Sequence, residues 1–383
     1  MRWLALLLAL RGATTAEEDP LLETAEALVR RAVPGWAMVP VSVRRGDLNH
    51  RGQHATIVFA NISSDEGVVV RVVGNGTASH CADAGACDAA ARAAGAAGCA
   101  PRVHWAGPLP GGGRATVTAR VLGDHLRAEF LRDAPADARR LGMLVRCLHR
   151  SLPFPRSGGA GGRLVAAGIL EAGEGAAAGA LGGFAARILG DYDDRRDRGR
   201  DTEAAFVALF GRVLRSRIGR SPLSGAAVPS HTDLHPGNLM RASPEGLVAI
   251  DFESAGTAPP SVDLAYSLLW PATHPPRATR EALVSAYLGG APATEDALWD
   301  LELGVVAALL LKVYSRLPRG ANGQLGLSNA KRRDALSRGA EVAAVASAFS
   351  ALEAAAPSAR ARRRVADIGV LAYARSRRPL VVS

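Results

Sequence analysis

The sequence predicts a two-lobed α+β fold, in which a small lobe with an antiparallel sheet precedes a larger helical lobe. The chain has 383 residues, which exceeds one average domain and suits two lobes. Runs rich in β-branched residues come early, and helical periodicity dominates the remainder. We therefore assign residues 20–122 to the first lobe and residues 123–383 to the second.

The first lobe begins with a predicted helix over Leu21–Val33, which is apolar at helical spacing and is ended by Pro34 and Gly35. Five strand-like runs follow, at Met38–Val43, Thr56–Ala60, Val68–Val73, Val103–Trp105 and Ala115–Val121. The turn cluster Asn61–Gly67 predicts that the second and third runs form a hairpin. An alanine-rich helix is expected over Ala82–Ala97, closed by Gly98.

The second lobe is expected to be helical, with one short interruption that carries two strands. The predicted helices are Arg139–His149, Phe184–Leu189, Glu203–Ile218, Ala282–Leu288, Leu298–Leu317 and Asp334–Leu352. The predicted strands are Asn238–Arg241 and Leu247–Asp251. Glycine-rich stretches at residues 158–162 and 173–179 are interpreted as surface loops.

The charge balance does not indicate a nucleic-acid partner. The formal net charge is +10, but lysine occurs only at Lys312 and Lys331, so arginine supplies almost all the positive charge. The arginines are scattered, with the densest run at Arg360–Arg364, and no nucleic-acid recognition motif accompanies them. We therefore expect no nucleic acid among the partners.

The cysteines and the N-terminus bear on the cellular compartment. The four cysteines form no C-x-x-C pair and none lies beside a histidine at metal-ligand spacing, so we expect reduced thiols and no zinc site. Residues 1–10 have the outline of a short signal sequence, but the run is too short to span a bilayer. Secretion, a misplaced start and a loose membrane-facing end remain open, and residues 1–19 are left out of the fold.

One segment carries residues suited to phosphoryl transfer. It contains H-x-D-x-x-x-x-N from His231 to Asn238, and an apolar strand that ends at Asp251. Such transfer needs a carboxylate to orient the attacking hydroxyl and metal ions to offset phosphate charge. Asp233 fits the first role, while Asn238 and Asp251 offer the oxygen ligands that Mg²⁺ prefers. His231 would pin the loop, and His235 is interpreted as a loop histidine.

This segment resembles the aminoglycoside phosphotransferase and choline/ethanolamine kinase superfamily, which has a bilobal protein-kinase-like fold. Asp251-Phe252-Glu253 and, ten positions later, Asp263 follow the superfamily pattern, which implies that Asp263 maintains the loop architecture. The stretch 68–77 and Gly98-Cys99-Ala100-Pro101 look like ethanolamine kinases, whereas residues 235–238 look more like the phosphotransferase branch. The resemblance implies that Arg71 on the third strand holds ATP phosphates.

The sequence departs from the family pattern in three places. The phosphate loop keeps one glycine, Gly46, and its final residue Asn49, which the resemblance places at the nucleotide. The helix glutamate that would pair with Arg71 falls at Cys87, and the shorter carboxylates of Asp88 and Asp83 are the alternatives. The family's tryptophans that cage a quaternary ammonium are missing from the stretch Leu301–Leu317, whose only aromatic is Tyr314, and this disfavours choline. A primary amine held by Glu253, Glu302 and Tyr314 is the resulting expectation.

Together these observations predict a phosphotransferase with an alcohol acceptor, dependent on ATP and Mg²⁺. The expected substrate is an amino alcohol, ethanolamine or else choline, in the synthesis of phospholipid head groups. We expect a cytoplasmic enzyme without stable membrane insertion, and a homodimer is left open. The alternatives are a kinase of another hydroxylated metabolite or an aminoglycoside, which the missing cage favours, and a nucleotide-binding pseudokinase, which the thin glycine loop favours.

Overall fold

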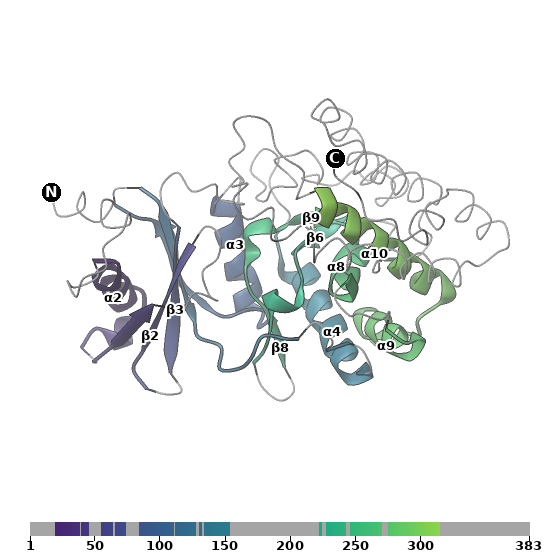
Figure 1. Ribbon diagram of the computed structural model, residues 1–383, viewed down its shortest axis with the longest axis horizontal. Helices are drawn as coiled ribbons and strands as arrows, with labels where there is room; N and C mark the ends of the chain where they lie inside the picture. The colour runs from purple at the N-terminus through teal and green to yellow at the C-terminus, as the bar shows by residue number, and fades with distance from the viewer. Residues whose placement is uncertain are drawn as a thin grey trace, which may run out of the picture.

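The computed structural model has the two lobes that the sequence predicts (Figure 1). The sheet lies at one end of the molecule and the helices α4, α8, α9 and α10 lie at the other. The structure describes residues 20–38, 40–45, 55–63, 66–73, 84–110, 112–127, 130–131, 134–153, 222–223, 227–242, 246–269 and 275–314. The predicted α+β bilobal fold is therefore confirmed, and the predicted helices at 184–189, 203–218 and 334–352 lie outside the described residues.

The first lobe is built on a five-stranded sheet in which every neighbouring pair is antiparallel. The strand order is β1 (Ser42–Arg45), β2 (Ala55–Asn61), β3 (Gly67–Val73), β5 (Arg114–Ala119) and β4 (Val103–Pro108). The predicted hairpin is β2–β3. The first strand begins at Ser42 and not at Met38, because Met38 follows the helical turn η1 (Pro34–Trp36) and is 94% exposed.

Helix α2 (Pro20–Ala32) covers one face of this sheet. Its buried Ala25, Leu28 and Val29 pack with Val58, Val70 and Val117 of the central strands. Burial alternates along β3, so Val70 and Val72 point into this core. Arg71 lies between them and therefore points from the opposite face of the sheet, away from α2.

Helix α3 (Ala84–Ala96) contacts both the sheet lobe and the helical lobe. It ends at Gly98, whose φ of +78° lies in the left-handed region that glycine adopts readily. The amides of Gly98 and Cys99 donate to the carbonyls of Gly95 and Ala94, which is a Schellman motif. The carbonyl of Cys99 then accepts from the amide of Ala249, 2.9 Å away in the other lobe.

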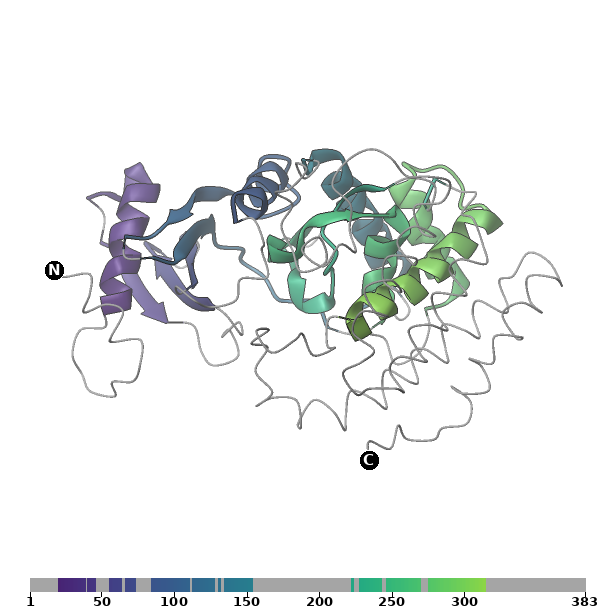
Figure 2. The ribbon, with the colours of Figure 1, turned by 90° about the horizontal axis from the view of Figure 1, so that it is seen from above.

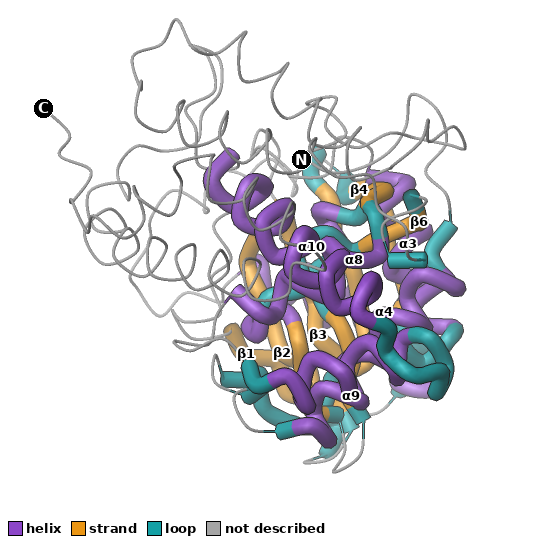
Figure 3. The backbone as a smooth tube through the Cα atoms, turned by 90° about the vertical axis from the view of Figure 1, so that its right-hand side faces the viewer, coloured by secondary structure: helices purple, strands orange, loops and turns teal. Residues whose placement is uncertain are grey.

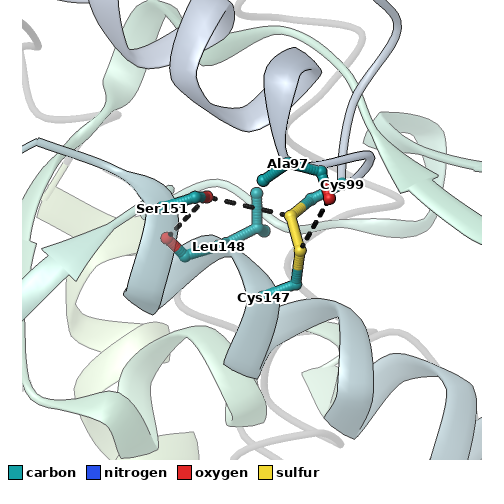
Figure 4. The surroundings of a disulfide bond; sticks show 5 residues. All are labelled: Ala97, Cys99, Cys147, Leu148 and Ser151. Atoms are coloured by element: carbon teal, nitrogen blue, oxygen red, sulfur yellow. Dashed lines mark hydrogen bonds between the residues drawn. A yellow bond between two sulfur atoms is a disulfide. The ribbon is translucent and has the colours of Figure 1, made fainter.

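A disulfide links the end of α3 to helix α4 (Pro135–Ser151) (Figure 4). Cys99 and Cys147 are separated by 48 positions in the sequence, and their Cα atoms lie 6.1 Å apart. The expectation of reduced thiols is wrong for this pair, and Cys87 is disulfide-bonded as well. The pairing depends on how α4 lies against the end of α3, which the spacing of cysteines in the sequence does not reveal.

Loss of this disulfide is expected to lower the free energy of unfolding by about 2–4 kcal/mol, because the bond restricts a long loop of the unfolded chain. Denaturant unfolding of Cys147→Ser and of the unchanged chain, each without reductant, measures the difference. With reductant present in both samples, the difference should disappear. Equal unfolding midpoints without reductant would contradict the prediction.

The second lobe combines helices with two short, two-stranded antiparallel sheets (Figures 2 and 3). The strand pairs are β6 (Val228–Ser230) with β9 (Gly256–Ala258), and β7 (Leu239–Arg241) with β8 (Leu247–Ala249). The helices after them are α8 (Pro260–Tyr266), α9 (Arg277–Tyr287) and α10 (Glu295–Tyr314). Glycines allow close helix packing, since a Cβ on Gly142 of α4 would meet the Leu283 carbonyl of α9.

The chain between the lobes pairs with β7. The amide of Leu126 donates to the carbonyl of Leu239, and the amide of Arg241 donates to the carbonyl of Asp124, each at 3.0 Å. Gly123 lies so close that a Cβ there would collide with the Arg241 carbonyl. The boundary at residues 122 and 123 stays a prediction. Among the described helices, none combines the length and apolar character needed to cross a membrane.

Candidate active site

The loop from His231 to Asn238 is anchored by the buried Asp263 at the start of α8. The two carboxylate oxygens of Asp263 accept from the backbone amides of His231 at 2.7 Å and Thr232 at 2.8 Å. Oδ2 also contacts Nε2 of His149, on α4, at 3.1 Å. Burial alone would raise the pKa of Asp263, but the hydrogen bond and charge of His149 outweigh it and lower that pKa.

His149 extends this anchor to helix α9. Its Nδ1 lies 3.0 Å from the hydroxyl of Tyr287, whose pKa burial raises to about 12. Tyr287 therefore keeps its proton at neutral pH. The carboxylate of Asp263 can only accept, so Nε2 of His149 carries a hydrogen and donates it to Asp263. A chain of hydrogen bonds from α9 through α4 thus fixes the carboxylate that holds the loop.

His231 ties the loop to the strand that precedes Asp251. Its Nδ1 accepts from the amide of Asp233, 3.3 Å away, and its Nε2 lies 3.0 Å from the carbonyl of Ile250. The ring therefore carries its hydrogen on Nε2 and donates it to Ile250. It also packs against Phe252, with ring centroids 4.8 Å apart. These contacts are of the structural kind that the sequence predicts for His231.

Asp233 and Asn238 lie together at the end of this loop. The side-chain amide of Asn238 donates to the backbone carbonyl of Asp233 at 3.0 Å and lies 3.5 Å from its Oδ2. These hydrogen bonds use the amide nitrogen of Asn238, so its side-chain oxygen could bind a ligand without breaking them. His235, which was interpreted as a loop residue, has its Nε2 3.9 Å from Oδ2 of Asp233.

Two residues of the site adopt left-handed backbone conformations that are uncommon outside glycine. Thr232 has φ of 63° and Asp251 has φ of 67°. The hydroxyl of Thr232 donates to the carbonyl of Ser254, which holds the loop against the turn η5 (Phe252–Ser254). Because Asp251 leaves the extended conformation, β8 ends at Ala249, two residues before the predicted end, and the Asp251 carboxylate is turned toward Arg71.

Arg71 reaches the second lobe from β3. One guanidinium nitrogen bonds Oε2 of Glu253, and the other lies 3.5 Å from Oδ1 of Asp251. Burial lowers the pKa of Arg71, but the two carboxylates outweigh it and raise that pKa, so the cation is permanent. Four of the predicted residues, Asp233, Asn238, Asp251 and Arg71, are therefore joined through the loop, β8 and the ion pair.

A family model described as the phosphotransferase enzyme family matches residues 48–298, which is more than half of the chain. The chain belongs to this family. The predicted resemblance to the superfamily is thereby confirmed. No curated protein sequence matches this phosphotransferase.

Solved structures share the fold of this phosphotransferase at low sequence identity. A choline/ethanolamine kinase family protein from Mesorhizobium loti is 17% identical over 90% of this chain and 98% of that chain, with a TM-score of 0.51. A Plasmodium vivax ethanolamine kinase is 12% identical over 94% and 89%, with a TM-score of 0.51. Choline kinase LicA from Streptococcus pneumoniae is 15% identical over 86% and 98%, at 0.50. At these identities the likeness shows a shared fold and nothing finer.

The carboxylate of Asp251 has the properties of a ligand for a hard cation. Its Oδ1 is buried and accepts no hydrogen bond among the described residues, and the guanidinium of Arg71 lies 3.5 Å away. The pKa of Asp251 is raised, mainly because the group is buried. The positive charge of Arg71 opposes this rise, and the negative charge of Glu253 adds to it. A divalent cation would compensate both the missing hydrogen bond and the cost of this negative charge. The residues present therefore fit Mg²⁺, which prefers one or two carboxylates from protein.

The structure does not bring every predicted residue of this phosphotransferase to the site. Glu302 is buried on α10, where it forms an ion pair with Arg280 of α9. The backbone of Tyr314 ends α10, but its side chain is outside the described residues, as is the whole of Asn49. Glu253 lies beside the site, with Arg71 as its partner.

Two residues that support the site were not identified from the sequence. His149 and Tyr287 lie 114 positions and 24 positions from Asp263, on two different helices. Each looks like an ordinary member of an amphipathic helix, and no spacing connects either residue with the motif. Only the packing of α4 against α9 brings them to the same carboxylate.

Proposed function

We propose that this phosphotransferase is an ATP- and Mg²⁺-dependent kinase that phosphorylates the hydroxyl of an amino alcohol, ethanolamine or else choline. The observation that carries the proposal is the convergence of Asp233, Asn238 and Asp251 at one place, with Arg71 reaching it from the sheet lobe. These are the groups that phosphoryl transfer requires: a base, metal ligands and a fixed cation.

In the proposed reaction Asp233 orients the acceptor hydroxyl and takes its proton. The hydroxyl oxygen then bonds to the γ-phosphorus, and the bond from that phosphorus to the leaving oxygen of ADP breaks. Arg71 offers a permanent positive charge to the phosphates. The remaining contacts of the loop, through His231 and Asp263, keep Asp233 in one position, which matters because the chemistry depends mainly on positioning.

Asn238 and Asp251 would hold Mg²⁺ through their side-chain oxygens. When bound, this ion would neutralise charge that develops on the transferred phosphates. The carbonyl of Asn238 accepts from the amide of Ile250 at 3.0 Å, so β7 and the end of β8 keep the two ligand residues together.

Acceptor-dependent release of ADP tests the proposal. The purified chain is incubated with ATP and Mg²⁺, and with ethanolamine, choline, homoserine or an aminoglycoside in turn. Release with ethanolamine or choline supports the proposed acceptor class. Release with homoserine or the aminoglycoside alone would move the enzyme to another acceptor class. ATP binding without release for any of them would favour a pseudokinase.

Asp251→Asn is expected to reduce Mg²⁺-dependent nucleotide binding by at least tenfold, because it removes the only carboxylate among the two proposed ligands. Titration of ATP in the presence of Mg²⁺ and again in the presence of EDTA measures the effect. The variant and the unchanged chain should differ with Mg²⁺ and become similar in EDTA. A loss of equal size in both conditions would contradict the metal role of Asp251.

A different hydroxylated acceptor is the second candidate, and the ion pairs of two carboxylates favour it. Glu253 and Glu302 were the residues expected to hold an ammonium group, but Arg71 and Arg280 already provide each of them with a positive charge. An amine would have to compete with these cations. An acceptor recognised mainly through hydroxyl groups would not, and a sugar without amino groups, added to the panel, distinguishes the two classes.

We also propose that the enzyme works in the cytoplasm, where ATP is available. The disulfide between Cys99 and Cys147 is unusual for such a location, because cytoplasmic thiols are normally kept reduced. The compartment therefore determines whether the disulfide cross-links the two lobes while the enzyme is active.

A further inference from the structure

In the family pattern, helix α3 carries a glutamate that pairs with the cation of the third strand. In this chain α3 has no carboxylate at that position. That position is occupied by Cys87, whose sulfur lies 3.8 Å from the backbone carbonyl of Glu253 and which is disulfide-bonded. The next residue on α3, Asp88, forms an ion pair with Arg114 of β5. In protein kinases the cation of the third strand depends on a helix carboxylate to hold it in place.

Arg71 instead obtains its carboxylate from the other lobe. Its partner Glu253 is 182 positions away, in the turn η5 that directly follows Asp251. The Arg71 and Glu253 side chains are 30% and 18% exposed, so solvent screens this pair less than a surface pair. The two guanidinium nitrogens face different residues, Glu253 on one side and Asp251 on the other.

The turn that carries Glu253 is itself held at two points. Cys87 contacts its backbone from α3, and the hydroxyl of Thr232 donates to the carbonyl of the adjacent Ser254. Glu253 is therefore fixed relative to both the helix of the sheet lobe and the loop that carries Asp233. A carboxylate in this place can set the position of Arg71 relative to the site.

We propose that Glu253 is a positioning residue for Arg71 and takes over the role of the carboxylate that α3 lacks. The proposal rests on the proposed function in one respect, that Arg71 binds the phosphates of ATP. It assigns Asp251 and Glu253 different tasks, with Asp251 available to the metal and Glu253 retained by the arginine. It also replaces the expectation that Glu253 binds the amine of the acceptor.

A double-mutant cycle on nucleotide affinity tests this role. The dissociation constant of ATP is measured by direct titration for Glu253→Gln, Arg71→Gln and the double variant, in EDTA and with Mg²⁺. Each single variant is expected to raise the dissociation constant of ATP roughly tenfold. A loss of this size is typical when one charge-assisted hydrogen bond is removed. The double variant should bind no more weakly than Arg71→Gln alone, because Glu253 acts through Arg71.

The matched control is Asp88→Asn, which breaks another arginine–carboxylate pair of the sheet lobe and should leave ATP affinity unchanged. Additive losses in the cycle would overturn the proposal. A rise in the KM for the acceptor with unchanged ATP affinity in Glu253→Gln would also overturn it and return Glu253 to the acceptor. If Glu253→Gln fails to fold, Glu253→Asp replaces it in the same cycle and should give a smaller, still non-additive loss.

These outcomes are separate from the test of the proposed function. In one outcome the cycle shows coupling between Arg71 and Glu253 in ATP binding while no tested acceptor is phosphorylated. That result would support the positioning role and contradict the proposed amino-alcohol kinase activity. Transfer to ethanolamine with no coupling would leave the proposed function in place and remove the role of Glu253.

Discussion

Asp233→Asn is expected to lower the turnover number for acceptor phosphorylation by about 10²–10⁴-fold, while ATP continues to bind. The substitution keeps the size of the side chain but removes the carboxylate that would take the hydroxyl proton. The hydrogen bond from Asn238 to the backbone carbonyl of residue 233 is retained, since it does not involve the altered side chain. The loop should therefore stay in place and the loss should be confined to chemistry.

Turnover is measured as acceptor-dependent ADP release, and nucleotide affinity by direct titration. Asp124→Asn is the matched control, because Asp124 is an exposed aspartate in the chain between the lobes and only its backbone is bonded to β7. A small loss of turnover in Asp233→Asn, similar to that of the control, would exclude Asp233 as the base. A parallel loss of ATP affinity would assign it to nucleotide binding instead.

Asp263→Ala is expected to lower the free energy of unfolding by about 3–5 kcal/mol. The carboxylate is fully buried and accepts from two backbone amides and from His149. Its removal leaves these donors buried without an acceptor, which costs more than the loss of the hydrogen bonds alone. Denaturant unfolding measures the change, with Asp124→Ala as the control for loss of an exposed aspartate. A change below about 0.5 kcal/mol, the usual effect at a surface position, would show that the loop does not depend on Asp263.

The same carboxylate should make stability depend on pH in acid. The pKa of Asp263 is lower in the folded protein than its ordinary value of about 3.9. Its stabilising contribution is therefore fully present above that ordinary value and is lost as the pH falls through the lower folded pKa. Below roughly pH 4 the unchanged chain should lose stability more steeply than Asp263→Ala.

The sequence predicted the elements whose pattern is local. The hairpin of β2 and β3 followed from two β-branched runs around a turn cluster, and α3 followed from an alanine-rich run closed by Gly98. The motif residues Asp233, Asn238 and Asp251 were found because phosphoryl transfer restricts both their types and their order. The end of β8 was placed two residues late. The apolar run continues up to Asp251, and nothing in that run indicates that Asp251 adopts a left-handed conformation.

Contacts between distant elements were not predictable in this way. The partner of Arg71 was sought on α3, where the sequence has Cys87, and the structure provides it as Glu253 from the other lobe. The expectation of reduced thiols failed for a similar reason, since the approach of Cys99 to Cys147 depends on helix packing. His149 shows the same limit, because only the packing of α4 brings it to Asp263.

The disulfide also changes the covalent topology of the molecule. Cys99 belongs to the sheet lobe and Cys147 to helix α4, so the bond closes a covalent ring that contains β4, β5 and the only backbone passage from one lobe to the other. A protease that cuts once anywhere within this ring would leave both lobes on a single molecule. The two fragments would separate in denaturant only after the sulfur–sulfur bond is reduced.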